Sequence, residues 1–190
     1  ESPIGPGELA IPAVRGIGGS LLYFVDRYGE KGSIWDVDFE WIGERDPHPE
    51  QAGLYYLDHL THNVMRGRMD HWADWYGKLF NFREIRFFNI EGKLTGLISR
   101  ALTSPCGKIR IPINESLDDK SQIEEYLRQY KGEGIQHVAM GSRDIYASVE
   151  ALRGNGLPFM PSPPATYYEK VDGRVPNHGE PVARLKENGI

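Results

Sequence analysis

The stretch from residue 132 to residue 140, Gly-Glu-Gly-Ile-Gln-His-Val-Ala-Met, constrains this chain more than any other. Its apolar residues are bounded by glycines on both sides, which predicts a short buried strand. His137 lies in the middle of that strand. A buried imidazole must be hydrogen-bonded, bound to a metal or functional, because an unsatisfied polar group in the core costs free energy. Most lone core histidines are only hydrogen-bonded, so this stretch needs support from elsewhere in the chain.

A second histidine occupies a similar position earlier in the sequence. Residues 57–64, Leu-Asp-His-Leu-Thr-His-Asn-Val, also have the pattern of a strand, and an amphipathic helix follows closely. His59 and His137 therefore lie at the same place in two strand–helix units. Because histidine is a common metal ligand, this repetition predicts a paired metal site in a duplicated module.

Composition limits the possible classes of function. Of the 190 residues, 39% are hydrophobic and 26% are charged, as in ordinary globular domains. The net charge of −5 gives no attraction to nucleic acid or to an anionic membrane, and no apolar run has the length of a transmembrane helix. Cys106 is the single cysteine, which excludes an internal disulfide and indicates a reducing, cytoplasmic environment. We expect neither nucleic acid nor membrane as a partner.

The sequence predicts two parts joined by a linker. Residues 1–19 contain no clear element, and strands are expected at residues 20–26 and 36–42. Two strands cannot stand alone, so residues 1–46 are interpreted as the tail of a preceding domain. Residues 47–52 read as a linker, and residues 53–190 as a second domain. The missing start methionine and the abrupt end at Ile190 indicate a segment of a longer protein.

The second part has the pattern of an α+β fold. After the strand with His59 we expect a helix at residues 69–80, strands at 83–90, 94–102 and 108–114, and a helix capped by Ser121. The strand with His137 and a helix capped by Asp144 follow, with a last helix at 180–188. This is one βαβββ unit and the opening of a second, incomplete one. Helical spacing predicts these buried residues: Met69, Trp72, Ala73, Tyr76, Leu79 and Phe80, then Ile123, Tyr126, Leu127 and Tyr130, then Ile145, Val149 and Leu152.

The histidine pair suggests a particular metal chemistry. Two neutral imidazoles and a carboxylate on one face of an octahedral ion leave positions open for a 2-oxo acid and O2, which suits Fe(II) dioxygenases. The carboxylate is not evident. Asp58 precedes His59 in its strand, so its side chain is expected on the opposite face, and neither it nor Glu133 is assigned a role.

Several phrases together resemble one family, the 4-hydroxyphenylpyruvate dioxygenases of the vicinal oxygen chelate superfamily. The resemblance covers nearly all of the chain, and its phrases occur in the expected order. They are IPAVRGIGGSLLYFVDRYG, LDHLTHNV, RGRMDHWADWYGKLFNFREIRFF, RIPINE, SQIEEYL, GEGIQHVAM and PPATYYE. The resemblance implies paired βαβββ modules, with residues 1–46 from the N-terminal oxygen-chelate domain and residues 53–190 from the catalytic one.

The resemblance also implies a function and a site. The family uses Fe(II) to convert 4-hydroxyphenylpyruvate and O2 to homogentisate and CO2 in tyrosine and phenylalanine catabolism, and a homo-oligomer is expected. His59 and His137 match the iron-binding histidines. The family's third ligand, a glutamate, lies in a strand beyond the end of this chain, so we expect the 190-residue piece to be inactive. The matching substrate-binding positions are Ser99, Asn114, Gln122 and Gln136.

Other interpretations stay open at this point. Gln122 could be exposed, Asn114 an ordinary turn residue and Ser99 an ordinary sheet residue. The parent could be a hydroxymandelate synthase-like dioxygenase, which acts on the same substrate but hydroxylates the side chain. It could also be a non-enzymatic oxygen-chelate module that binds a small molecule. His62 receives no role. His48, His71 and His178 also receive none, and they are interpreted as surface residues.

Overall fold

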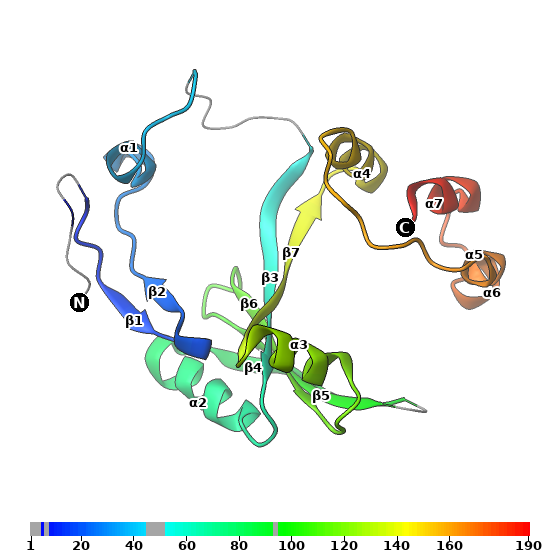
Figure 1. The fold of residues 1–190 in the computed structure, drawn as a ribbon, viewed down its shortest axis with the longest axis horizontal. Helices are drawn as coiled ribbons and strands as arrows, with labels where there is room; N and C mark the ends of the chain where they lie inside the picture. Colours follow the sequence, from blue (N-terminus) through cyan, green and yellow to red (C-terminus); the bar gives the residue numbers. More distant parts are fainter. Residues whose placement is uncertain (1–4, 6–7, 45–51, 93–94) are drawn as a thin grey trace. The chain divides into compact units, whose positions relative to one another are not determined.

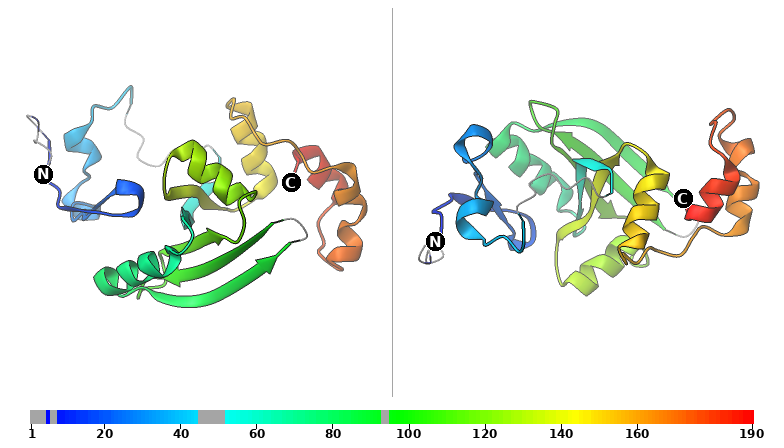
Figure 2. Two further views of the ribbon diagram at one scale, coloured as in Figure 1. Left: turned by 60° about the horizontal axis from the view of Figure 1, so that its bottom comes forward. Right: turned by 90° about the horizontal axis from the view of Figure 1, so that it is seen from above.

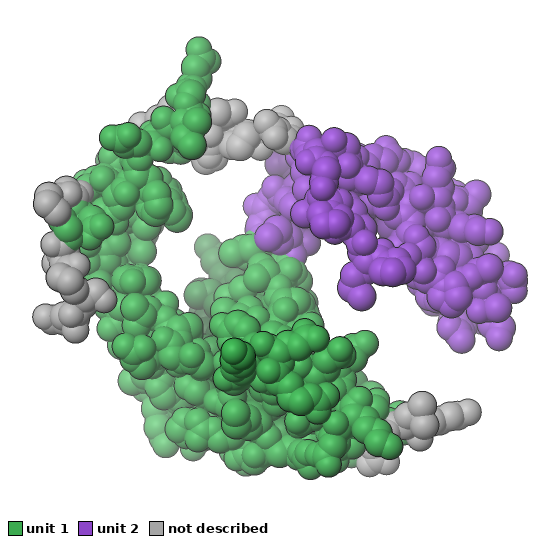
Figure 3. Space-filling view, in the orientation of Figure 1, with its two compact units in different colours: residues 1–47, 57–139 green, residues 48–56, 140–190 purple. Residues whose placement is uncertain are grey.

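The computed structural model describes residues 5, 8–44, 52–92 and 95–190. The chain divides into two compact units, which Figure 3 colours separately. One unit combines residues 1–47 with residues 57–139, and the other combines residues 48–56 with residues 140–190. Every residue that the sequence singled out for a site lies within residues 57–139, and so within the first unit.

A mixed sheet organises the first unit (Figure 1). Its strands are β3 (Leu54–Val64), β4 (Arg83–Glu91), β5 (Gly96–Thr103), β6 (Arg110–Ser116) and β7 (Gly134–Ser142). They lie in the order β4-β5-β6-β3-β7, with β4, β5 and β6 antiparallel and β3 parallel to β6. Between β5 and β6, Gly107 has a φ of +72°, which glycine adopts without a steric penalty. The predicted βαβββ unit and the opening of a second are confirmed, and β3 and β7 lie next to each other.

One face of the sheet packs on helix α2 (Met69–Phe80), which has the predicted bounds (Figure 2). Because α2 carries apolar residues at helical spacing, it buries one side against the strands. Asn81 ends the helix in the left-handed conformation, with a φ of 56°. Leu79, predicted to be buried, is exposed. The core comprises Met69, Trp72, Ala73 and Tyr76 of α2, Val64, Leu102, Ile111 and Ile113 of the sheet, and Ile17.

Two further helices begin at the caps that the sequence predicts. The Ser121 side chain accepts a hydrogen bond from the Glu124 amide at the start of α3 (Gln122–Tyr130). Asp144 accepts from two amides at the start of α4 (Ile145–Gly154). The predicted buried faces are only partly right. Ile123, Leu127 and Val149 are buried, Tyr126 and Leu152 are half-buried, and Tyr130 and Ile145 are exposed.

The N-terminal segment differs most from its prediction. A strand β1 (Ala13–Arg15) and a 3-10 helix (Ile17–Gly19) lie where no element was expected, and β1 pairs with β2 (Leu21–Tyr23), which is shorter than predicted. The strand predicted at residues 36–42 is wrong: helix α1 (Trp35–Asp38) occupies its first part. Ser33 accepts a hydrogen bond from the Trp35 amide, and alternation alone makes no strand without a pairing partner. A further 3-10 helix spans Gly29–Lys31.

The second unit is mainly helical. It contains α4 and the helices α5 (Ala165–Glu169), α6 (Val171–Arg174) and α7 (Val182–Asn188), the last close to the prediction. The Tyr146 hydroxyl donates to Glu180 at 2.7 Å, and the Arg184 guanidinium lies 4.1 Å from the Tyr146 ring centroid. No helix among the described residues has both the length and the apolarity needed to cross a membrane. Most of the predicted linker at residues 47–52 lies outside the described residues.

Candidate functional site

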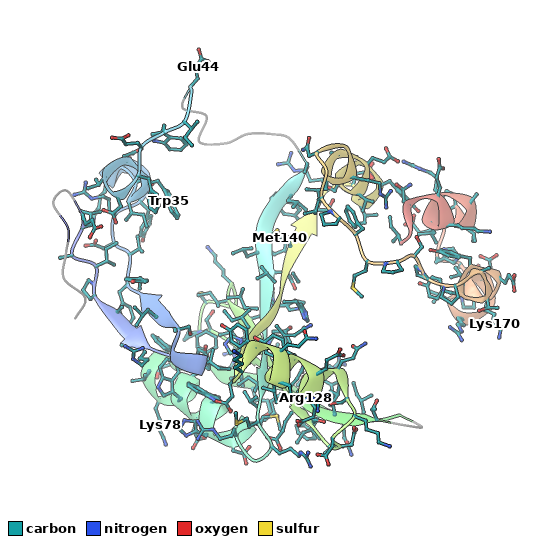
Figure 4. The ribbon with its side chains drawn as sticks, viewed as in Figure 1. Trp35, Glu44, Lys78, Arg128, Met140 and Lys170 are labelled. Carbon is teal, nitrogen blue, oxygen red and sulfur yellow. The ribbon has the colours of Figure 1, made fainter. Side chains whose placement is uncertain are left out.

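Two histidines from neighbouring strands face each other at the centre of the candidate site. His59 lies on β3 and His137 on β7, and their ring centroids are 5.5 Å apart with the planes at 75°. β7 is not the buried strand that the apolar run predicted. Ile135, Val138 and Met140, the last labelled in Figure 4, are 40%, 43% and 51% exposed. His137 is itself exposed and the His59 side chain is 29% exposed, so solutes can reach both imidazoles.

Each histidine has its Nδ1 atom next to the residue that precedes it in the chain. Asp58 Oδ2 lies 2.7 Å from His59 Nδ1, and Gln136 Oε1 makes a short contact with His137 Nδ1. The expectation that Asp58 points away from His59 is thus wrong for its carboxylate. Strand alternation fixes the direction of Cβ, whereas rotation about the side-chain bonds carries the carboxylate round to the ring.

The Nε2 atom of His137 has a polar neighbour on β3. It lies 3.0 Å from the Thr61 hydroxyl, which the sequence analysis did not single out. Burial, and secondly the nearby His59, lower the pKa of His137. A lowered pKa favours the neutral imidazole, the form that can bind a metal.

Two other candidate ligands are excluded by their contacts. His62 lies in the core with 1% of its surface exposed, and its Nε2 is 2.7 Å from the Tyr76 hydroxyl. The Glu133 carboxylate accepts from the Trp72 indole and the Met65 amide. Among the described ranges, no group of three or more His, Cys, Asp or Glu side chains could hold a metal ion. Two imidazoles are thus the donors that the described residues offer, and they suit Fe(II) as part of a set that includes a carboxylate.

A row of polar side chains crosses the sheet on the face that carries the histidine pair. Ser99 on β5 is the register partner of Asn114 on β6, which in turn is the partner of Asn63 on β3. Asn63 and Ser99 are buried, at 3% and 7% exposure, and Asn63 has the same strand parity as His59 and Thr61. Its Oδ1 atom is buried without a hydrogen-bond partner among the described residues. Asn63 was not among the residues predicted from the sequence, although its even spacing from His59 was a usable signal.

The structure brings some of the predicted substrate-binding residues together and leaves others apart. Ser99 and Asn114 lie side by side, and Gln136 contacts His137. Gln122 is exposed on the first turn of α3, as the simpler interpretation had it. The polar row lies further along the sheet from the histidine pair, because Asn63 follows His59 by four positions on β3, a separation of about 13 Å at the usual strand rise.

The remaining histidines divide between core and surface. His62 belongs to the core described above. His71 is exposed on α2, as predicted. His178 is less exposed than expected, because its side chain, 14% exposed, lies 2.8 Å from Asp172. His48 lies outside the described residues.

Two family models match the chain in succession. The description "Glyoxalase/Bleomycin resistance protein/Dioxygenase superfamily" covers residues 56–177, and "Hydroxyphenylpyruvate dioxygenase, HPPD, N-terminal" covers residues 1–40. The chain therefore belongs to the glyoxalase/bleomycin resistance protein/dioxygenase superfamily. Within it, the expected resemblance to 4-hydroxyphenylpyruvate dioxygenases is confirmed by the relatives that follow.

The similarity to named proteins is high over half of their length. The chain is 65% identical to a 4-hydroxyphenylpyruvate dioxygenase of Pseudomonas aeruginosa, across 95% of this chain and 50% of the relative. It is 63% identical to hemolysin VllY of Vibrio vulnificus, across 98% and 52%. A solved mutant of 4-hydroxymandelate synthase from Streptomyces coelicolor superposes with a TM-score of 0.73 at 21% identity, across 98% of this chain and 53% of that one. This last similarity concerns the fold alone. The chain spans about half the length of the curated relatives it matches.

Proposed function

We propose that this chain supplies two iron ligands and part of the substrate pocket of a 4-hydroxyphenylpyruvate dioxygenase. The reaction converts 4-hydroxyphenylpyruvate and O2 to homogentisate and CO2. The observation that carries the proposal is the approach of His59 and His137 on neighbouring strands, in a chain that is 65% identical to a dioxygenase of that name. Fe(II), when bound, would supply the activation of O2 by the 2-oxo acid.

The histidine contacts support a site prepared for a metal. Nδ1 of His59 and Nδ1 of His137 each have a polar side-chain neighbour, and the pKa of His137 is lowered by burial. His59 Nδ1 contacts a carboxylate, and a neutral imidazole that donates from Nδ1 keeps its Nε2 lone pair for a metal ion. These contacts orient both rings before a metal arrives.

The polar row supports a role in positioning the substrate. In the proposal, Ser99 and Asn114 orient polar groups of the substrate through hydrogen bonds, and Gln136 does so next to His137. Neutral amide and hydroxyl groups can do this without adding charge to the site. Gln122 is exposed in the structure, so its assignment to the same role depends on the family resemblance alone.

The proposal extends to domains and location. The interval between the two family matches, residues 41–55, includes the proposed linker at residues 47–52. This supports the assignment of residues 1–46 to the N-terminal oxygen-chelate domain and of residues 53–190 to the catalytic domain. We further propose a cytoplasmic enzyme of tyrosine breakdown that works as a homo-oligomer.

Two imidazoles without a carboxylate should bind a divalent metal weakly, because charge and geometry are incomplete. We therefore expect weak Fe(II) binding and no turnover by the 190-residue chain. Anaerobic calorimetry with Fe(II) tests the metal assignment. His59→Ala and His137→Ala should each abolish the binding, whereas the matched variant His71→Ala, on the exposed side of α2, should bind as the unaltered chain does.

The binding measurements and the reaction product test the metal site and the reaction separately. Metal binding that survives both His59→Ala and His137→Ala would refute the paired site. Binding lost in His71→Ala would place the metal on the surface of α2. For the reaction itself, the chain joined to a carboxylate-bearing remainder should consume O2 with 4-hydroxyphenylpyruvate and release homogentisate. Release of hydroxymandelate would instead assign the alternative dioxygenase chemistry.

A further inference from the structure

We propose that Asp58 is a positioning residue that fixes the tautomer of His59, with Arg110 holding Asp58 in place. The inference deepens the proposed metal site and rests on it for its functional meaning. Three side chains form the arrangement, and they come from two adjacent strands. Asp58 and His59 are consecutive on β3, and Arg110 is the first residue of β6.

The contacts form a continuous chain from Arg110 to the ring. Arg110 Nη1 lies 3.1 Å from Asp58 Oδ1, and the other carboxylate oxygen, Oδ2, lies 2.7 Å from His59 Nδ1. The same Arg110 nitrogen is 3.5 Å from the Asp58 carbonyl oxygen, so it restrains both backbone and side chain. The Asp58 and His59 side chains are 33% and 29% exposed, so neither is sealed in the core.

An ionised carboxylate can only accept hydrogen bonds. His59 Nδ1 must therefore carry the proton that it donates to Asp58, and a neutral imidazole then has its lone pair on Nε2. Metal-binding histidines usually donate the second ring N–H to a carboxylate, a carbonyl or water, and this fixes both tautomer and orientation. In the proposal, the Asp58 carboxylate fixes the Nδ1-protonated tautomer of His59 before any metal is bound.

The second histidine lacks such a forced choice. The Gln136 side chain beside His137 Nδ1 is an amide, which offers an acceptor or a donor depending on its orientation. Thr61 beside His137 Nε2 is a hydroxyl, which can likewise donate or accept. Since both neighbours can play either role, His137 can adopt either tautomer. His59 is thus the ligand whose orientation is set by charge.

Nitrogen-15 NMR of the imidazole rings tests the proposal directly, since protonated and unprotonated ring nitrogens have distinct shifts. The spectrum is recorded at about pH 8, where free imidazoles are neutral. We expect His59 in the unaltered chain to be almost wholly protonated on Nδ1. In Asp58→Asn the amide can donate as well as accept, so a substantial Nε2-protonated fraction should appear. His137 in the same spectrum serves as an internal comparison and should not change.

A matched control removes a different carboxylate from an arginine pair. Asp70 pairs with Arg100 and its side chain is 87% exposed, so Asp70→Asn should leave the His59 signals unchanged. Arg110→Gln removes the support of Asp58 while keeping the carboxylate, and should broaden or shift the His59 Nδ1 signal. The proposal is overturned if His59 in the unaltered chain is protonated on Nε2, a result that needs no variant to fold. It is also overturned if Asp58→Asn folds and keeps the unaltered tautomer.

Cobalt(II) titration links the tautomer to the metal. Loss of such a supporting group typically weakens metal binding by about 10–100-fold, and we expect a loss of this size for Asp58→Asn. Equal Co(II) affinity in Asp58→Asn and the unaltered chain would overturn the positioning role. If the unaltered chain shows the expected tautomer but binds no Co(II), the metal function fails while the assignment of Asp58 to His59 stands.

Discussion

Acid should destabilise this protein through the core histidine His62. Its side chain is 1% exposed, and its Nε2 contacts the Tyr76 hydroxyl at 2.7 Å. Burial lowers the pKa of His62 from 6.5 to about 4. Below pH 6.5 the unfolded chain binds a proton at this position that the folded chain does not bind. The free energy of unfolding should therefore fall as the pH drops from about 6.5 to about 4, and this contribution should level off below about pH 4.

The size of the effect follows from the shift in pKa. Each pKa unit corresponds to about 1.4 kcal/mol. At pH 4 the folded-state imidazole is half protonated, so slightly less than the full shift is expressed, and the loss should be about 3 kcal/mol. This is a large part of the ~5–15 kcal/mol by which a typical domain is stable. The histidine alone should thus produce a measurable acid transition.

Urea denaturation followed by tryptophan fluorescence, repeated between pH 7 and pH 4, measures this contribution. His62→Gln removes the titrating group but keeps a side chain that can hydrogen-bond to Tyr76. The unaltered chain should lose about 3 kcal/mol more than His62→Gln over this range, because all other groups titrate equally in both. His71→Gln, an exposed counterpart, should follow the unaltered chain. Parallel pH profiles for the unaltered chain and His62→Gln would refute the assignment.

Three substitutions test the packing around the same core by urea denaturation at pH 7. Tyr76→Phe should cost about 1–3 kcal/mol, because it leaves the buried His62 Nε2 without its partner; no loss would mean that the contact is absent. Gly18→Ala should cost more than about 1 kcal/mol, since φ is +58° and the new Cβ would lie 2.0 Å from the Glu133 carbonyl oxygen. Glu133→Gln should cost about 1–3 kcal/mol, because one of the two buried acceptor oxygens of Glu133 becomes a donor. As its control, Glu124→Gln removes an ion pair of 3.7 Å with Arg66 and should cost less than about 1 kcal/mol. Equal losses for the two glutamates would contradict the anchoring role of Glu133.

The elements around the sheet could be predicted because their signals are local. The apolar spacing along α2 and the caps Ser121 and Asp144 fix helix positions from neighbouring residues alone. The N-terminal segment lacks this property. Residues 36–42 alternate like a strand, yet Trp35–Asp38 is helical, because a strand also needs a partner that local alternation cannot supply. Ile17, in a stretch expected to hold no element, is 1% exposed in the core beneath α2.

The candidate site was predictable to a smaller extent. The repeated strand–histidine pattern brought out His59 and His137, and their strands are adjacent. The alignment of Ser99 with Asn114 depends on strand register, which no stretch of the sequence specifies by itself. Asp58 was placed on the wrong side because alternation describes Cβ and not the end of a rotatable side chain. The apolar run around His137 suggested burial, but burial depends on what packs against a strand.

Alternate side chains of β3 point to two faces, one that packs in the core and one that carries the candidate site. His62 and Val64, at 1% and 0% exposure, face the core under α2. His59, Thr61 and Asn63 have the opposite parity and belong to the face with the histidine pair and the polar row. Packing on α2 fixes the strand register, because a slip by one residue would turn Val64 away from α2 and His59 towards it. The apolar packing of β3 on α2 therefore holds His59, the proposed metal ligand, in register with its neighbours.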